Sequence, residues 1–155
     1  MRRRSVSQAL MRAPAVAPGS RVYREVKDER AWVIVEVVGQ ENTVLECNDG
    51  VLDLGFHELL YANDQSYADM TSMEHLHEPG LLENLRTRIL EQRLPYTFMS
   101  TVVVAVNPLM AVPQPEMDEY KDAAFGSRDP HPYAVAELAY ARLTGPGAPD
   151  QSIVV

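Results

Sequence analysis

Residues 98–108 read Phe-Met-Ser-Thr-Val-Val-Val-Ala-Val-Asn-Pro, and this stretch decides the fold expected for the 155-residue chain. From Phe98 to Val106 the sequence is almost continuously apolar, which is typical of a strand buried on both faces of a parallel sheet. Asn107 and Pro108 close the run, because proline disfavours continuation of a strand. We therefore predict a buried strand over residues 98–106.

Helical patterns lie on both sides of this segment. Residues 78–92 carry leucine and isoleucine at helical spacing, with Pro79 in the first turn, where proline is tolerated. A second helix is predicted over residues 132–143, and the β-branched run at 152–155 predicts another strand. The order helix, strand, helix, strand indicates an α/β fold.

Residues 31–54 follow a different pattern. Three short runs rich in β-branched residues, 31–38, 43–47 and 51–54, are separated by turn residues, including the hairpin signal Asn48-Asp49-Gly50. This spacing predicts a small antiparallel β module, which needs a neighbour to bury its open face. We expect Trp32 to belong to its core and Cys47 to be a core or edge residue.

Composition and charge limit the function. Hydrophobic residues make up 46% of the chain, and the single cysteine excludes an internal disulfide. No apolar run approaches the length of a transmembrane helix. Residues 1–30 carry a net charge of +5, so the remaining 125 residues carry −13 within the total of −8. An acidic body argues against nucleic-acid binding, which requires clustered cations.

The chain begins with a basic segment that contains no acidic residue up to Gly19. We assign residues 1–28 to a flexible basic leader, 29–64 to the small β module and 65–155 to the α/β segment. Segments of such low packing potential are usually disordered. An alternative interpretation of the Arg- and Ser-containing start is a mitochondrial transit peptide.

Six blocks of the second half, in order and spacing, resemble the opening of a myosin motor domain. They are residues 69–73, 77–88, 95–98, 102–108, 130–136 and 150–153. The likeness covers about ninety residues and implies an incomplete piece of a motor core of the P-loop NTPase type. The β module resembles the Src-homology-three-like barrel that precedes the core in many myosins. The resemblance implies an actin-based, ATP-driven motor of the cytoplasm and cytoskeleton.

In that family the strand matching residues 151–155 leads into the phosphate-binding loop. The 155 residues contain no Gly-x-x-x-x-Gly-Lys-Ser/Thr motif, although that motif supplies the phosphate contacts of these enzymes. We therefore expect an N-terminal motor fragment that does not hydrolyse ATP alone, and whether to class it as an enzyme stays open. The complete motor would bind ATP, Mg²⁺ and actin, whereas no cofactor is expected on the isolated chain. This chain would also have the rest of the motor domain as a partner.

Asn107 and Pro108 are the candidate ligand-binding residues. Ligands of α/β sheets lie beyond the carboxyl ends of strands, where this dipeptide is expected. By resemblance, the matching Asn-Pro begins the loop that covers the adenine ring, so Asn107 and Pro108 would line the adenine side. The chain departs from the family at Met110, Ala111 and Pro115, where many myosins carry basic residues and a tyrosine. The alternative is that the dipeptide simply ends a strand.

No catalytic residue and no metal site are expected. His75 and His77 are two residues apart, but zinc requires a third ligand. The lone histidines, the isolated cysteine and the acidic cluster lack the partners of a catalytic group. These residues are His57, His131, Cys47, Glu116, Asp118 and Glu119.

Two other function classes remain open. The chain is either a non-enzymatic adaptor, built from the β module and a partial motor fold, or an independent nucleotide-binding protein. A soluble, cooperatively melting monomer would favour the adaptor. An aggregating chain would favour the motor fragment, because open strand edges promote aggregation. An independent nucleotide-binding protein would bind ATP measurably on its own.

Overall fold

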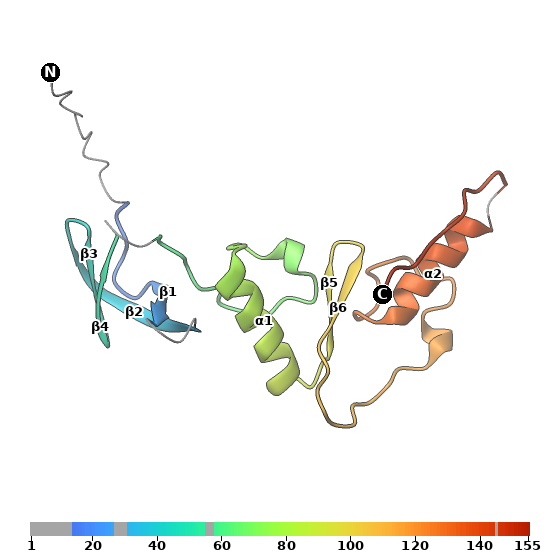
Figure 1. Cartoon of the computed structure of the whole chain (residues 1–155), viewed down its shortest axis with the longest axis horizontal. Helices are drawn as coiled ribbons and strands as arrows, with labels where there is room; N and C mark the ends of the chain where they lie inside the picture. The colour runs from blue at the N-terminus through green and yellow to red at the C-terminus, as the bar shows by residue number, and fades with distance from the viewer. Residues whose placement is uncertain (1–13, 27–30, 55–57, 145) are drawn as a thin grey trace, which may run out of the picture. The chain divides into compact units, whose positions relative to one another are not determined.

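The computed structural model of the chain describes residues 14–26, 31–54, 58–144 and 146–155. They form two compact units, one ending at Ala62 and one beginning at Asn63 (Figure 1). The Arg-rich start and His57 lie outside the described residues. No helix within the described ranges is long and apolar enough to cross a bilayer.

The first unit is a four-stranded antiparallel sheet in the order β1-β2-β3-β4. Its strands are β1 (Arg21–Val26), β2 (Ala31–Glu41), β3 (Val44–Cys47) and β4 (Gly50–Asp53). Three of them confirm the predicted meander. Gly50, in the predicted hairpin turn, has a φ of 149°, which side-chain-bearing residues rarely adopt.

Strand β1 lies inside the range 1–28, where we expected a flexible leader. It pairs with β2 along its whole length, and Val22 is fully buried. The Tyr23 N–H also donates to the Leu60 carbonyl (2.8 Å). The expectation of a leader extending to residue 28 is therefore wrong at residues 21–26, because the strand depends on pairing partners distant in sequence.

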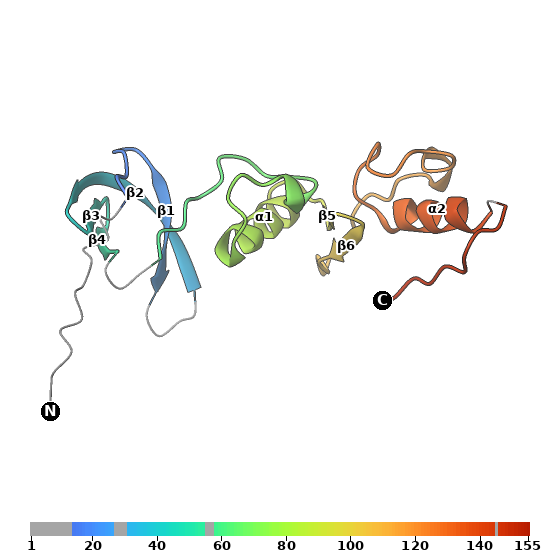
Figure 2. The same cartoon turned by 90° about the horizontal axis from the view of Figure 1, so that it is seen from above.

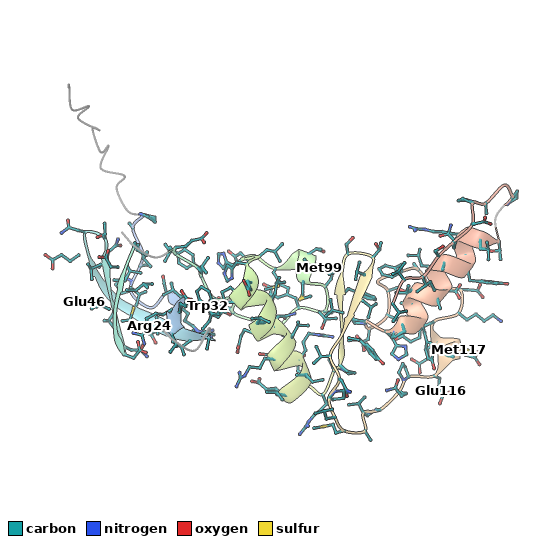
Figure 3. All side chains as sticks on the ribbon, in the orientation of Figure 1. Arg24, Trp32, Glu46, Met99, Glu116 and Met117 are labelled. Atoms are coloured by element: carbon teal, nitrogen blue, oxygen red, sulfur yellow. The ribbon has the colours of Figure 1, made fainter. Side chains whose placement is uncertain are left out.

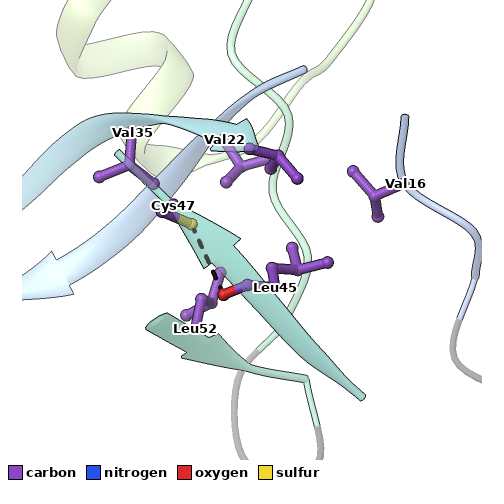
Figure 4. Packing of buried hydrophobic residues seen from close by; sticks show 7 residues of the cluster. Val16, Val22, Val35, Leu45, Cys47 and Leu52 are labelled. Carbon is purple, nitrogen blue, oxygen red and sulfur yellow. Dashed lines mark hydrogen bonds between the residues drawn. The ribbon is translucent and has the colours of Figure 1, made fainter. Parts of the chain in front are cut away.

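The core of the first unit lies on one face of this sheet (Figure 4). Seven buried residues form it: Val16, Val22, Val35, Val37, Leu45, Cys47 and Leu52. Cys47 therefore lies in the core, which is one of the two positions predicted for it. Trp32 is only half-buried and outside the cluster, so its predicted core position is wrong. Trp32, labelled in Figure 3, lies at the start of β2, where it pairs with Glu25 of β1 but precedes the part of β2 that pairs with β3.

The second unit combines two helices with a hairpin (Figures 1 and 2). Its elements are η1 (Met70–Ser72), α1 (Glu78–Leu90), β5 (Tyr96–Met99), β6 (Val102–Ala105), η2 (Met117–Glu119) and α2 (Pro132–Leu143). Both predicted helices are confirmed, α1 ending two residues early. Phe98, Tyr120 and Ala134 form a small core.

The buried strand predicted over residues 98–106 is wrong. The segment folds into the antiparallel hairpin β5–β6, in which Met99 pairs with Val102. Ser100 and Thr101 make the turn, with Ser100 in the left-handed region at φ 57°. The two polar residues interrupt the apolar run and allow the chain to reverse. Val102 is consequently 59% exposed rather than buried.

The strand predicted at the end of the chain is also not formed. Residues 151–155 have no regular structure, and Val154 is 92% exposed. Every pairing between the named strands is antiparallel, and the one parallel bridge among the described residues joins only Asp69 to Phe98. The predicted parallel α/β sheet is therefore not observed, because no described strand lies beside this segment to pair with it.

Candidate functional site

The candidate site is the loop that follows β6. The Val106 N–H donates to the Pro95 carbonyl (2.9 Å), so pairing with the β5 side continues to the start of the loop. Asn107 is exposed, and its Oδ1 accepts a hydrogen bond from the Leu109 N–H (2.9 Å). Leu109 has a φ of 52° and is 89% exposed. Asn107 therefore shapes a local turn that leaves an amide group and an apolar side chain at the surface.

Asp69 fixes the hairpin that carries this loop. Its Oδ1 accepts hydrogen bonds from the Thr71 N–H (2.9 Å), the Thr71 hydroxyl (2.8 Å) and the Ser100 N–H (3.2 Å). Burial alone would raise the pKa of Asp69, but these hydrogen bonds outweigh it and lower the pKa. The ionised carboxylate thus joins η1 to the β5–β6 turn.

Two side-chain contacts hold the loop farther along. The Arg93 Nη1 lies 2.8 Å from the Met110 sulfur, and Arg93 itself has a φ of 62°. Gln114 Oε1 lies 3.1 Å from the Nε2 of His131. The loop is therefore attached to the chain beyond α1 at one point and to the start of α2 at another.

His131 is both the N-cap of α2 and the centre of an aromatic cluster. Its Nδ1 accepts a hydrogen bond from the Tyr133 N–H (3.2 Å), so the neutral ring carries its proton on Nε2 and donates to Gln114. The rings of Tyr96, Tyr120 and Tyr133 lie 4.9, 5.6 and 4.3 Å from the imidazole between centroids. Burial lowers the pKa of His131, because the charged form loses hydration.

A cavity of about 510 Å³ lies between the end of α1, strand β5 and the residues around Gln114 and His131. Arg88 lines it and is only 5% exposed. Its Nε donates to Thr97 Oγ1 (2.9 Å) and its Nη2 to the Tyr96 carbonyl (2.9 Å). Burial lowers the pKa of Arg88, and Asp129 opposes that change. Asn107 and Pro108 are not among the lining residues.

Comparison with known proteins identifies this second unit. Residues 67–155 match the myosin head (motor domain) family. The chain belongs to the myosin head family. Among its relatives from Arabidopsis thaliana, Myosin-13 is 36% identical over 160 residues and Myosin-8 is 37% identical over 154 residues. These alignments cover 95% and 92% of this chain but 10% of each relative, so the chain spans about a tenth of their length.

The myosin head match contains the whole second unit except its first few residues. Asn107, Pro108 and the loop contacts all lie inside it. The β sheet of the first unit lies outside the family match, although the alignments with the plant myosins extend over most of the chain. The small antiparallel sheet followed by helices fits the N-terminal part of a myosin head.

Other residues singled out in the sequence have structural positions. His77 caps α1, because its Nδ1 accepts a hydrogen bond from the Gly80 N–H (3.1 Å). No group of three or more His, Cys, Asp and Glu side chains in the described part of the chain is placed to hold a metal. Burial, followed by Asp49, raises the pKa of Cys47 despite the opposing Arg24. Glu116, Asp118 and Glu119 are exposed, and Figure 3 shows Glu116 beside Met117 before α2.

Sequence reasoning missed Arg88 and the capping role of His131. Arg88 occupies the helical face that also buries Asn84, four residues earlier, whereas the leucine pattern pointed to other positions. Leu82, on the predicted apolar face, is 54% exposed. A signal for His131 was present, since a polar residue followed by proline marks the start of a helix.

Proposed function

We propose that this chain supplies the N-terminal part of an actin-based, ATP-driven myosin motor, and that Asn107 and Pro108 contribute the adenine side of its nucleotide site. The family membership supports the motor assignment. The small share of each relative that the alignments cover supports a role within a larger assembly. ATP, Mg²⁺ and actin would bind to the complete motor, with the remaining motor domain as the chain's own partner.

One observation carries the assignment of the loop: the exposed turn at Asn107. The Oδ1 atom of Asn107 accepts a hydrogen bond from the Leu109 N–H. The side-chain NH₂ group can therefore donate a hydrogen bond to a purine ring nitrogen. The exposed Leu109 side chain and Pro108 supply apolar surface for the flat face of a base. The residues present therefore fit a nucleotide base.

The phosphate end of the nucleotide is not assigned to residues of this chain. Phosphoryl transfer requires a loop of backbone N–H groups, a lysine and a magnesium-binding hydroxyl. The 155-residue sequence has no Gly-x-x-x-x-Gly-Lys-Ser/Thr motif. We propose that residues elsewhere in the motor bind the phosphates of ATP, while this chain orients the base. The β sheet would correspond to the Src-homology-three-like module and the second unit to part of the P-loop NTPase core.

The test measures nucleotide affinity in a motor domain that contains these residues at its N-terminus. Asn107→Ala should weaken ATP binding about two- to twelvefold, because one hydrogen bond contributes roughly 0.5–1.5 kcal/mol. Val51→Ala, at an exposed side chain of β4 in the first unit, is the control and should leave the affinity unchanged. Equal affinities for the parent and Asn107→Ala would remove Asn107 from the site. Failure of the whole domain to bind ATP or actin would overturn the motor proposal.

The isolated chain provides a complementary measurement. Calorimetric titration of residues 1–155 with millimolar ATP should give no binding heat and no hydrolysis. Measurable ATP turnover by this chain alone would contradict the division of labour proposed here.

A further inference from the structure

We propose that the cavity beside Arg88 is a binding site for a small aromatic carboxylate, separate from the base contacts proposed at Asn107 and Pro108. Its volume of about 510 Å³ falls in the range of small-molecule pockets, roughly 300–1,000 Å³. The cavity belongs entirely to the second unit. Pro113 and Gln114, farther along the same loop, line the cavity, whereas Asn107 does not.

Arg88 supplies the first argument. Its side chain is more than nine-tenths buried, and both of its hydrogen-bond acceptors, the Thr97 hydroxyl and the Tyr96 carbonyl, are uncharged. Asp129 acts on Arg88 electrostatically, but within the described residues no carboxylate lies at ion-pair distance from it. Buried charges are usually paired, because desolvation is costly. A carboxylate in the cavity would provide the missing pair.

The geometry of the guanidinium indicates how this anion would bind. Nε and Nη2 already donate to the protein, so Nη1 keeps two N–H groups and Nη2 keeps one. Two parallel donors suit the two oxygens of one carboxylate, which gives the bidentate arrangement that Arg favours. Arg88 is held in place by its two protein bonds, so little side-chain entropy is lost on binding.

The charges around the cavity also favour an anion. Arg93 and Arg128 line it together with Arg88, while Glu119 and Asp129 are its two acidic residues. The wall thus carries one excess positive charge in a chain of net charge −8. One monocarboxylate would neutralise this excess, whereas a doubly charged phosphate would overshoot it beside two acids.

The rest of the wall suits an aromatic body. The Tyr96 and His131 rings meet edge to face, with centroids 4.9 Å apart, and both line the cavity. Leu94, Pro95 and Pro113 add apolar surface. A flat hydrophobic ring would bury against these side chains while its carboxylate reaches Arg88.

The test titrates residues 1–155 with 2-naphthoate and with 2-naphthamide, which has nearly the same shape but no charge. The readout is the affinity together with the NMR shift of the Arg88 Nε–H group. We expect 2-naphthoate to bind at least tenfold more tightly than the amide and to shift this resonance. Equal affinities, or binding that leaves the Arg88 signal unchanged, would overturn the proposal.

Three variants localise the site. Arg88→Gln should weaken 2-naphthoate binding at least tenfold. Arg86→Gln, an exposed arginine on the same helix, is the matched control and should bind as the parent does. If Arg88→Gln loses its circular dichroism spectrum, Ser127→Trp keeps the test intact, because it fills the cavity from an exposed loop and retains Arg88. Undiminished binding by Ser127→Trp would place the ligand elsewhere and refute the site.

Discussion

The Nε of Arg88 donates a 2.9 Å hydrogen bond to the hydroxyl of Thr97, and both residues are almost completely buried. This contact joins helix α1 to strand β5, nine residues later in the chain. The interior between the two elements is therefore polar rather than leucine-filled. A buried polar contact contributes specificity of packing, because an arrangement that separates α1 from β5 leaves the cation without this acceptor.

Replacing the acceptor tests this contact. Thr97→Val keeps the side-chain shape and suits a strand, but it leaves the Arg88 Nε–H without an acceptor. We expect a loss of about 1.5–3 kcal/mol in unfolding free energy, the usual cost for a hydrogen bond to a charged group. Urea titration followed by helical circular dichroism measures it, since both α-helices lie in the second unit. Thr101→Val in the exposed hairpin turn should change stability by less than about 0.5 kcal/mol.

Acidification should destabilise the second unit through His131. Burial lowers the folded-state pKa below the ordinary value of 6.5, so the neutral imidazole is favoured on folding. The stability contribution is complete above pH 6.5 and is lost as the pH falls through 6.5 toward the lower folded pKa. A proton on Nδ1 would also remove the acceptor for the Tyr133 N–H.

The measurement compares unfolding free energies at several pH values for the parent and His131→Asn. Asparagine can cap a helix through its side-chain oxygen but does not titrate in this range. The variant should therefore lose the part of the pH dependence that the parent shows below neutrality. Identical pH profiles for the two proteins would show that His131 is not the titrating group.

Asp69 should stabilise the hairpin only while it is ionised. Its lowered pKa means that the contribution is present above the ordinary value of 3.8 and is lost as the pH falls below it. Asp69→Ala should cost about 0.5–2 kcal/mol at neutral pH, the range for losing a capping side chain. Denaturation with urea at pH 7 measures this loss. Asp150→Ala, in the exposed final stretch, should have no measurable effect.

The β unit has a core of its own, and shortening the Leu45 side chain tests it. Leu45 is fully buried, so Leu45→Ala should cost about 2–5 kcal/mol through lost burial and cavity formation. Trp32 is the single tryptophan and lies in β2, so its fluorescence reports on this unit. Val51→Ala, on an exposed side chain of neighbouring β4, serves as the control. A comparable loss for both variants would contradict this assignment of the core.

The sequence predicted those elements whose signals are local. Proline in the first turn and apolar spacing located α1 and α2, and the Asn48-Asp49-Gly50 turn located β3 and β4. The same reasoning missed β1, and it read residues 98–106 as one strand. A strand gains its hydrogen bonds from partners distant in sequence, so a local pattern does not specify its pairing or its depth of burial.

For the candidate site, the sequence alone determined the family and singled out the Asn107–Pro108 dipeptide, because the order and spacing of short motifs can be read directly from the sequence. Only the tertiary structure decided that the loop begins after a two-stranded hairpin and that Asn107 binds its own neighbour Leu109. It also brought Arg88, Tyr96 and His131 to one cavity across more than forty residues of chain. Side chains separated in sequence meet only when packing places their elements together, and that placement depends on long-range contacts which no local pattern records.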